Sequence, residues 1–195
     1  MKLRHFMKRL LSILLLLIFT GSFAFTQPEA FKSGTEPDGF RGIKWGESIT
    51  ALKDMHQVWD GGEKKFYERS GDSLEIGGAK LHRIVYTFWQ GRFSEVRIEI
   101  LKDYGNPQDE FAHFKTLRKV CFDRFGARRK IFFGGEEYSW FGDLSWVKLV
   151  RHDPGLLQLT MGSTTLLRQR ESYDQESVRR EKEFRQYLAK ARTGF

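Results

Sequence analysis

Residues 81–101 read LHRIVYTFWQGRFSEVRIEIL, and this stretch decides the fold class. Two runs rich in β-branched and aromatic residues, Leu81–Trp89 and Arg92–Leu101, flank the dipeptide Gln90–Gly91, a combination typical of a β-hairpin. Across Ser94–Ile100, small or apolar residues alternate with charged ones, so one face of this strand is expected to be buried and the other wet. The stretch therefore predicts an antiparallel sheet.

Short apolar runs between turn residues recur on both sides of this hairpin. Upstream of it, strands are expected at Lys65–Arg69 and Ser73–Ile76. Downstream, the expected strands are about Lys130–Phe133 continuing toward Tyr138–Trp140, Ser145–Arg151, and Leu156–Met161. With the hairpin they make about six to eight strands, and their tight connections favour antiparallel pairing.

Two helices are predicted between these blocks of strands. The first covers Glu47 to about His56, where apolar residues recur at helical spacing. The second runs from Pro107 to Phe125, with Asn106 as its N-cap and Gly126 at its end. The predicted fold class is α+β: an antiparallel sheet of about six to eight strands with two helices packed on one face, plus a C-terminal helix. The order of elements in the two halves also suggests a duplicated unit of a helix followed by strands.

The first 24 residues have the organisation of a secretory signal peptide. Four basic residues occupy the first nine positions, an apolar run follows over Leu10–Phe19, and Ser22 and Ala24 satisfy the small-x-small cleavage rule. Cleavage is expected after Ala24, which implies residence in the periplasm of a two-membrane bacterium. The alternative is an uncleaved signal anchor, and in this interpretation only that segment contacts a membrane.

Removal of residues 1–24 changes the charge balance. The full chain has 33 basic and 25 acidic residues, a net charge of +8, and loss of the four basic signal residues leaves a net charge of +4. Residues 25–39 are expected to form a flexible leader, 40–167 the α+β domain, and 168–195 a charged C-terminal helix. The leader and the domain together, residues 25–167, carry only one excess positive charge, so nucleic acid is not an expected partner.

No catalytic, cofactor-binding or metal site is predicted, and no cofactor is implied. Among the five histidines, no two show the i, i+4 spacing of a helical zinc pair. Cys121, the single cysteine, falls within the apolar arc of the second predicted helix. It is therefore expected to be an inert packed thiol rather than a nucleophile. Glu136 and Glu137 are adjacent, so in a strand they point to opposite faces and cannot act together.

The aromatic residues are concentrated in the predicted strands. Because successive side chains of a strand face opposite sides, some of the indoles are expected on an open sheet face. The C-terminal segment adds aromatic side chains next to arginines, the residue types that dominate protein interfaces. Core packing of the tryptophans and docking of the C-terminal helix on its own domain are the alternatives. The expected interaction surface comprises Trp89, Trp140, Trp146, Arg180, Phe184, Arg185 and Tyr187.

The predicted domain opens with FRGIKWG, Phe40–Gly46. This stretch resembles the start of small exported bacterial proteins of uncharacterised function, in which F-x-G-I-x-W-G opens an α+β domain behind a signal peptide. The resemblance implies no catalytic residues.

Export and the missing catalytic groups together suggest a function class. We expect a periplasmic, non-catalytic binding or accessory domain whose partner is an envelope protein or glycan. The alternative is a cell-envelope hydrolase of the glycosidase type, with paired carboxylates in an aromatic-lined cleft.

Overall fold

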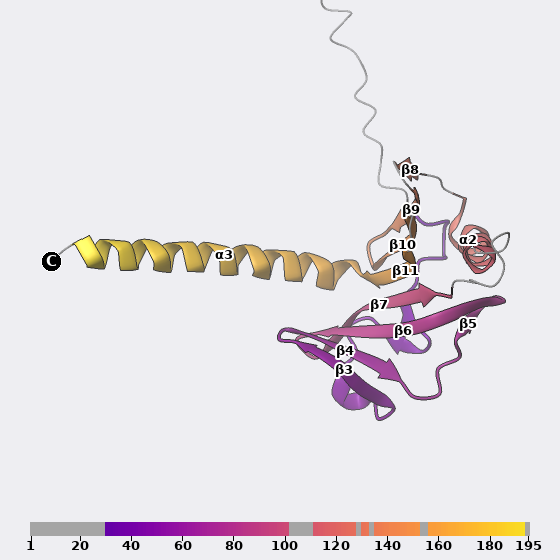
Figure 1. Ribbon diagram of the computed structural model, residues 1–195, viewed down its shortest axis with the longest axis horizontal. Coiled ribbons are helices and arrows are strands. Elements are labelled where there is room, and N and C mark those ends of the chain that lie inside the picture. Colours follow the sequence, from indigo (N-terminus) through magenta and orange to yellow (C-terminus); the bar gives the residue numbers. More distant parts are fainter. Residues whose placement is uncertain (1–29, 102–110, 128–129, 133–134, 153–155, 194–195) are drawn as a thin grey trace, which may run out of the picture.

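The computed structural model describes residues 30–101, 111–127, 130–132, 135–152 and 156–193, without the side chains of 130–132 and 187–193. The expected signal peptide lies outside the described residues. The chain is α+β, with a large antiparallel sheet and two helices, α2 (Ala112–Phe125) and α3 (Thr164–Thr193) (Figure 1). The antiparallel α+β fold predicted from the hairpin is thereby confirmed.

The main sheet has the strand order β3-β4-β6-β7-β11-β10-β9-β8, and the short β5 pairs with β6. The predicted hairpin is the β6–β7 pair. The strands are β3 (Met55–Gly61), β4 (Lys64–Arg69), β5 (Glu75–Ile76), β6 (Ala79–Trp89), β7 (Arg92–Ile100), β8 (Lys130–Phe132), β9 (Gly135–Phe141), β10 (Ser145–His152) and β11 (Leu156–Ser163).

The strand order is symmetrical about the central β7–β11 pair. The 3-10 turn η1 (Ile49–Ala51) precedes β3, β4, β6 and β7, and α2 precedes β8 to β11. The last strands of these two series, β7 and β11, pair at the centre of the sheet, where Ile98 lies opposite Leu159. A duplicated unit of a helix followed by four strands would give this mirrored order.

One face of the sheet forms a continuous hydrophobic core with α2. In β7 the residues predicted to face inward are buried, as the alternation indicates. The buried helix residues come from the predicted apolar arc, and full burial of each Phe or Leu side chain contributes about 1.5–3 kcal/mol. They are Phe114, Leu117, Cys121 and Phe125.

The predicted first helix is wrong over most of its length. Only Ile49–Ala51 are helical, and β3 begins at Met55. The N–H of Gly46 donates to the carbonyl of Phe93 at 2.8 Å, and the N–H of Ile49 donates to the carbonyl of Gly91 at 2.9 Å. These bonds fix the segment to the β6–β7 hairpin, so its backbone donors are used there and not in a longer helix.

Residues 30–39, expected in a flexible leader, are part of the domain. The N–H of Lys32 donates to the carbonyl of Phe125 at 2.9 Å. The Glu36 carboxylate accepts hydrogen bonds from the N–H groups of Leu144, at 2.6 Å, and Ser145, at 2.7 Å. Turn-forming residues also build ordered loops, and this part of the expected leader is held by hydrogen bonds to distant segments.

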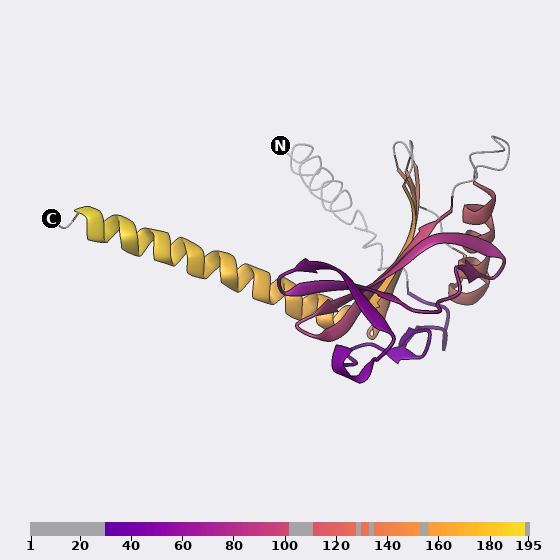
Figure 2. The ribbon, with the colours of Figure 1, turned by 60° about the horizontal axis from the view of Figure 1, so that its bottom comes forward.

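The helix α3 follows β11 directly, earlier than the expected start at residue 168. Its first turns contact the domain: Leu166 is buried, Arg170 lies 3.8 Å from Glu95, and the Tyr173 ring meets the Trp89 ring edge-on. Beyond these turns the helix projects away from the sheet (Figures 1 and 2). The C-terminal helix is thus docked at one end and extended at the other.

Candidate functional site

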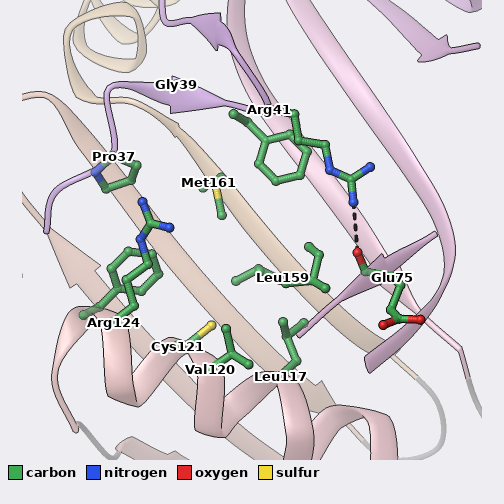
Figure 3. Close-up of a pocket in the computed structure, with 13 residues that line it drawn as sticks. Pro37, Gly39, Arg41, Glu75, Leu117, Val120, Cys121, Arg124, Leu159 and Met161 are labelled. Carbon is green, nitrogen blue, oxygen red and sulfur yellow. Dashed lines mark hydrogen bonds between the residues drawn. The ribbon is translucent and has the colours of Figure 1, made fainter. Parts of the chain in front are cut away.

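A cavity of about 350 Å³ lies between α2, the sheet and the hairpin of β1 (Gly39–Phe40) and β2 (Ile43–Lys44) (Figure 3). One wall is the helix, and β11 passes behind the cavity. Pro37–Arg41 form the opposite wall, and Ile76 of β5 contributes to the lining. The FRGIKWG stretch therefore supplies part of the wall of this cavity.

The lining is mainly apolar, with three charged side chains. Ligand sites in proteins are usually concave, apolar and about 300–1,000 Å³ in volume, with a few polar groups that orient the ligand. This cavity falls within that range. Its apolar lining residues are Pro37, Phe40, Ile76, Leu117, Val120, Cys121, Phe125, Leu159 and Met161, and its charged ones are Arg41, Glu75 and Arg124.

The β1–β2 hairpin is built by close backbone contacts. A Cβ atom on Gly39 would lie 2.0 Å from the carbonyl oxygen of Ile43, so a larger residue cannot take this position without a shift. The indole N–H of Trp45 donates to the carbonyl of Pro37 at 3.0 Å, and its ring stacks on Phe93 at 4.8 Å. Gly39 and Trp45 thereby hold the cavity wall in place.

The charged side chains of the lining have different partners. Arg41 lies 3.0 Å from the Asp72 carboxylate and donates to the carbonyl of Glu75 at 3.1 Å (Figure 3). The exposed Arg124 packs over the Phe125 ring at 5.6 Å and makes no ion pair among the described residues. Figure 3 shows the Arg124 side chain pointing toward Pro37. Arg124 is therefore a lining cation that pairs with no carboxylate of the described residues.

Cys121 lies on the helical wall and is only 2% exposed. Burial raises the pKa of its thiol to about 12, although the nearby charge of Arg124 acts in the opposite direction. A thiol with this pKa is almost entirely protonated at neutral pH and is a poor nucleophile. The predicted burial of Cys121 is confirmed.

The best-connected carboxylate, Glu136, lies beside a second hollow of about 630 Å³ that α2 also lines. It accepts hydrogen bonds at 3.0 Å from both Arg118 and Arg151, and another from the Tyr138 hydroxyl. Burial by itself would raise the pKa of Glu136, but these three partners lower it overall. Glu137 pairs instead with Lys148 at 3.0 Å. The two adjacent glutamates thus have separate partners.

Two of the tryptophans in the expected interaction surface are buried. Trp140 is 0% exposed, packs against Phe125, and donates its indole N–H to the carbonyl of Gly126 at 2.9 Å. Trp89 is 4% exposed and lies against Tyr173. Alternation along a strand does not show which face is covered, and these two indoles contribute almost no area to an outer surface.

The other expected residues lie on two separate elements. Trp146 of β10 is partly exposed, and its neighbour Val147 points into the core, so the indole lies on the opposite face. Arg180, Phe184 and Arg185 are exposed on the projecting part of α3. The side chain of Tyr187 lies outside the described residues.

None of the cavity residues belongs to the expected interaction surface. Two sequence signals fall in this cavity, FRGIKWG and the apolar arc of α2. The cavity forms only where distant segments meet, and its lining comes from residues 37–41, 75–76, 117–125 and 159–161.

Within the described parts of the chain, no helix combines the length and apolarity needed to cross a membrane. In those same parts, His, Cys, Asp and Glu form no group of three or more that could hold a metal ion.

No family model, curated protein or solved structure matches the chain.

Proposed function

We propose that the chain is an exported, periplasmic, non-catalytic binding or accessory domain that holds a small apolar molecule in the cavity beneath the β1–β2 hairpin. The observation that carries the proposal is the cavity itself, at about 350 Å³ with mainly apolar walls. Burying apolar ligand surface there is favourable without any reacting group. We also propose that η1 and α2 lie on the same face of the sheet, because residues of both pack on one hydrophobic cluster.

The groups around the cavity favour binding over hydrolysis. A glycosidase needs two carboxyl groups about 5–10 Å apart, one of them an acid with a raised pKa. Glu75 is the one carboxylate in the lining of this cavity, and Cys121 is its one thiol. Glu95 has a pKa raised by burial, but it does not line the cavity and pairs with Arg170 of α3.

Partner binding through α3 is a second proposal, and the projection of this helix from the domain favours it. Val178 and Phe184 are 68% and 60% exposed on the projecting part. Arg180 and Arg185 flank Phe184 there, a combination suited to an envelope protein or glycan. We propose Trp146 and Tyr187 as further residues that contact this partner.

Export is proposed from the N-terminal sequence. Mass spectrometry of the native protein should give a chain that starts at Phe25. A retained Met1 in an inner-membrane fraction would instead support the uncleaved anchor.

Binding is tested by calorimetric titration with decan-1-ol, a neutral aliphatic probe. The wild-type protein should bind it with one site, and Cys121→Phe should not, because the new ring fills the cavity. Val178→Phe, which adds the same ring on the exposed part of α3, is the matched control and should bind normally. If Cys121→Phe does not fold, Val120→Phe at the half-buried rim replaces it. Absence of binding by the wild-type protein would contradict the proposal.

A further inference from the structure

We infer that the ligand of this cavity is an amphipathic anion, an aliphatic chain with one anionic head group, whose head is held by Arg124 and whose chain lies against α2 and β11. The inference rests on the proposed function and adds the chemical class of the ligand.

The deep walls select an aliphatic body. The buried lining side chains on α2 and β11 are apolar, apart from the thiol of Cys121, and are at most 6% exposed. An uncharged polar ligand would lose its hydrogen bonds to water without replacing them there. An aliphatic chain gains from burial, and each added methylene should raise the affinity about three- to fourfold until the space is filled.

The volume limits the length of that chain. If one water-sized group takes about 30 Å³, a cavity of about 350 Å³ holds about a dozen such groups. Decanoate, with ten carbon and two oxygen atoms, has this size. Affinity should therefore rise with chain length up to about ten carbons and then level off.

The charges at the cavity select the head group. The charge of Arg41 is neutralised by Asp72 at 3.0 Å, and Glu75 is exposed and offers only its carbonyl to Arg41. Arg124 makes no ion pair among the described residues and lines the same cavity. Its guanidinium presents paired donors that match the oxygens of a carboxylate or a phosphate. The carboxylate of Glu75 makes no ion pair among the described residues either, but Figure 3 shows it on the opposite side of the cavity from Arg124. A ligand anion beside Arg124 therefore complements the unpaired positive charge on that side.

The test crosses two ligands with three proteins. Decanoate and decan-1-ol share a chain and differ in charge, and each is titrated calorimetrically into the full-length wild type, Arg124→Ala and Lys115→Ala. Lys115 is exposed on the same helix and makes no ion pair among the described residues, so its variant controls for net charge. The wild type and Lys115→Ala should bind decanoate about tenfold more tightly than decan-1-ol. Arg124→Ala should bind both ligands equally, with its affinity for decan-1-ol unchanged.

The outcomes separate this inference from the proposed function. Equal affinity of the wild type for decanoate and decan-1-ol would overturn the anionic class while the cavity remained a binding site. A preference for decanoate that survives in Arg124→Ala would overturn the role of Arg124. Failure to bind either ligand would overturn both proposals. Decyl phosphate in place of decanoate tells whether the head group is a carboxylate or a phosphate, since the better-matched anion binds more tightly.

Discussion

The guanidinium of Arg41 lies 3.0 Å from the carboxylate of Asp72, and this ion pair fastens the β1–β2 hairpin over the cavity. The Tyr86 hydroxyl also donates to Asp72. Burial raises the pKa of Tyr86, so its hydroxyl remains protonated and continues to donate. The side chains of Arg41 and Asp72 are only 21% and 11% exposed. One carboxylate therefore connects the hairpin to the core strand β6.

Asp72→Asn should destabilise the protein by about 1–3 kcal/mol, because it removes the charge that pairs with a largely buried guanidinium. Urea denaturation gives this difference in the free energy of unfolding. Asp60→Asn is the control, since Asp60 and its partner Lys65 are each nearly half exposed, and its cost should stay below about 0.5 kcal/mol. Equal effects of the two substitutions would show that Asp72 does not fasten the hairpin.

Cys121 should resist alkylation by iodoacetamide in the folded protein and react rapidly once urea unfolds it. Its burial and its pKa of about 12 leave almost no accessible thiolate at neutral pH. Cys121→Ser should also lower the free energy of unfolding by about 1–3 kcal/mol, since it buries a hydroxyl in an apolar wall. Fast labelling under native conditions would contradict this account of the thiol.

Glu95→Gln should raise the free energy of unfolding at neutral pH. Burial raises the pKa of Glu95, although the charges of Arg170, Lys64 and Arg97 partly offset this. Because the pKa of Glu95 is higher in the folded state than in the unfolded state, this carboxyl stabilises the fold only when it is protonated. Its stabilisation is complete below the pKa of the unfolded state and is lost as the pH rises through the pKa of the folded state. The gain in the free energy of unfolding from Glu95→Gln should therefore shrink as the pH falls toward about 4, the ordinary pKa range of a Glu carboxyl. Urea titrations at several pH values between neutral and about 4 measure this change.

Glu136→Gln is the matched control for Glu95→Gln, with the opposite sign. The pKa of Glu136 is lowered overall, so its stabilisation is present above the unfolded pKa and is lost as the pH falls through the folded pKa. This variant should be less stable than wild type at neutral pH, and acidification should reduce the difference. A change of the same sign in both variants would contradict the assigned environments.

Two deletions separate the docked and projecting parts of α3. Deletion of 178–195 should leave the melting temperature almost unchanged, because Leu166, Arg170 and Tyr173 keep their contacts with the domain. Deletion of 171–195 also removes the contact between Tyr173 and Trp89 and should lower the melting temperature measurably. Equal melting temperatures for the two deletions would show that Tyr173 does not contribute to docking.

Apart from β3, the strands of the main sheet and the second helix were predictable because their patterns are local. Alternation from Ser94 to Ile100 assigns the buried face of β7, and the apolar arc ending at Phe125 assigns the buried face of α2. The spacing of apolar residues at Ile49 and Leu52 fits both a helix and a single turn. Hydrogen bonds to the β6–β7 hairpin decide between them, and a local pattern does not contain that information.

The candidate site was not predictable, because it depends on the packing of distant segments. Nothing near Trp140 in the sequence shows that its strand face is covered by α2, and the cavity beside Cys121 exists only when β1, β5, α2 and β11 come together. FRGIKWG and the apolar arc of α2 were the local signals that fall in this region. The role of both as parts of the cavity wall became visible only in the folded chain.

The most direct test of a ligand-binding cavity is a ¹³C-methyl NMR titration of the methionines. The chain has four methionines, and of these only Met55 and Met161 belong to the described domain. Met161 lines the cavity, whereas Met55 packs on the core from β3 and does not line it. Assignment with Met161→Leu identifies the two signals. Decan-1-ol or decanoate should shift the Met161 signal saturably and leave Met55 unchanged. An unmoved Met161 signal, or equal shifts of both signals, would contradict binding in this cavity.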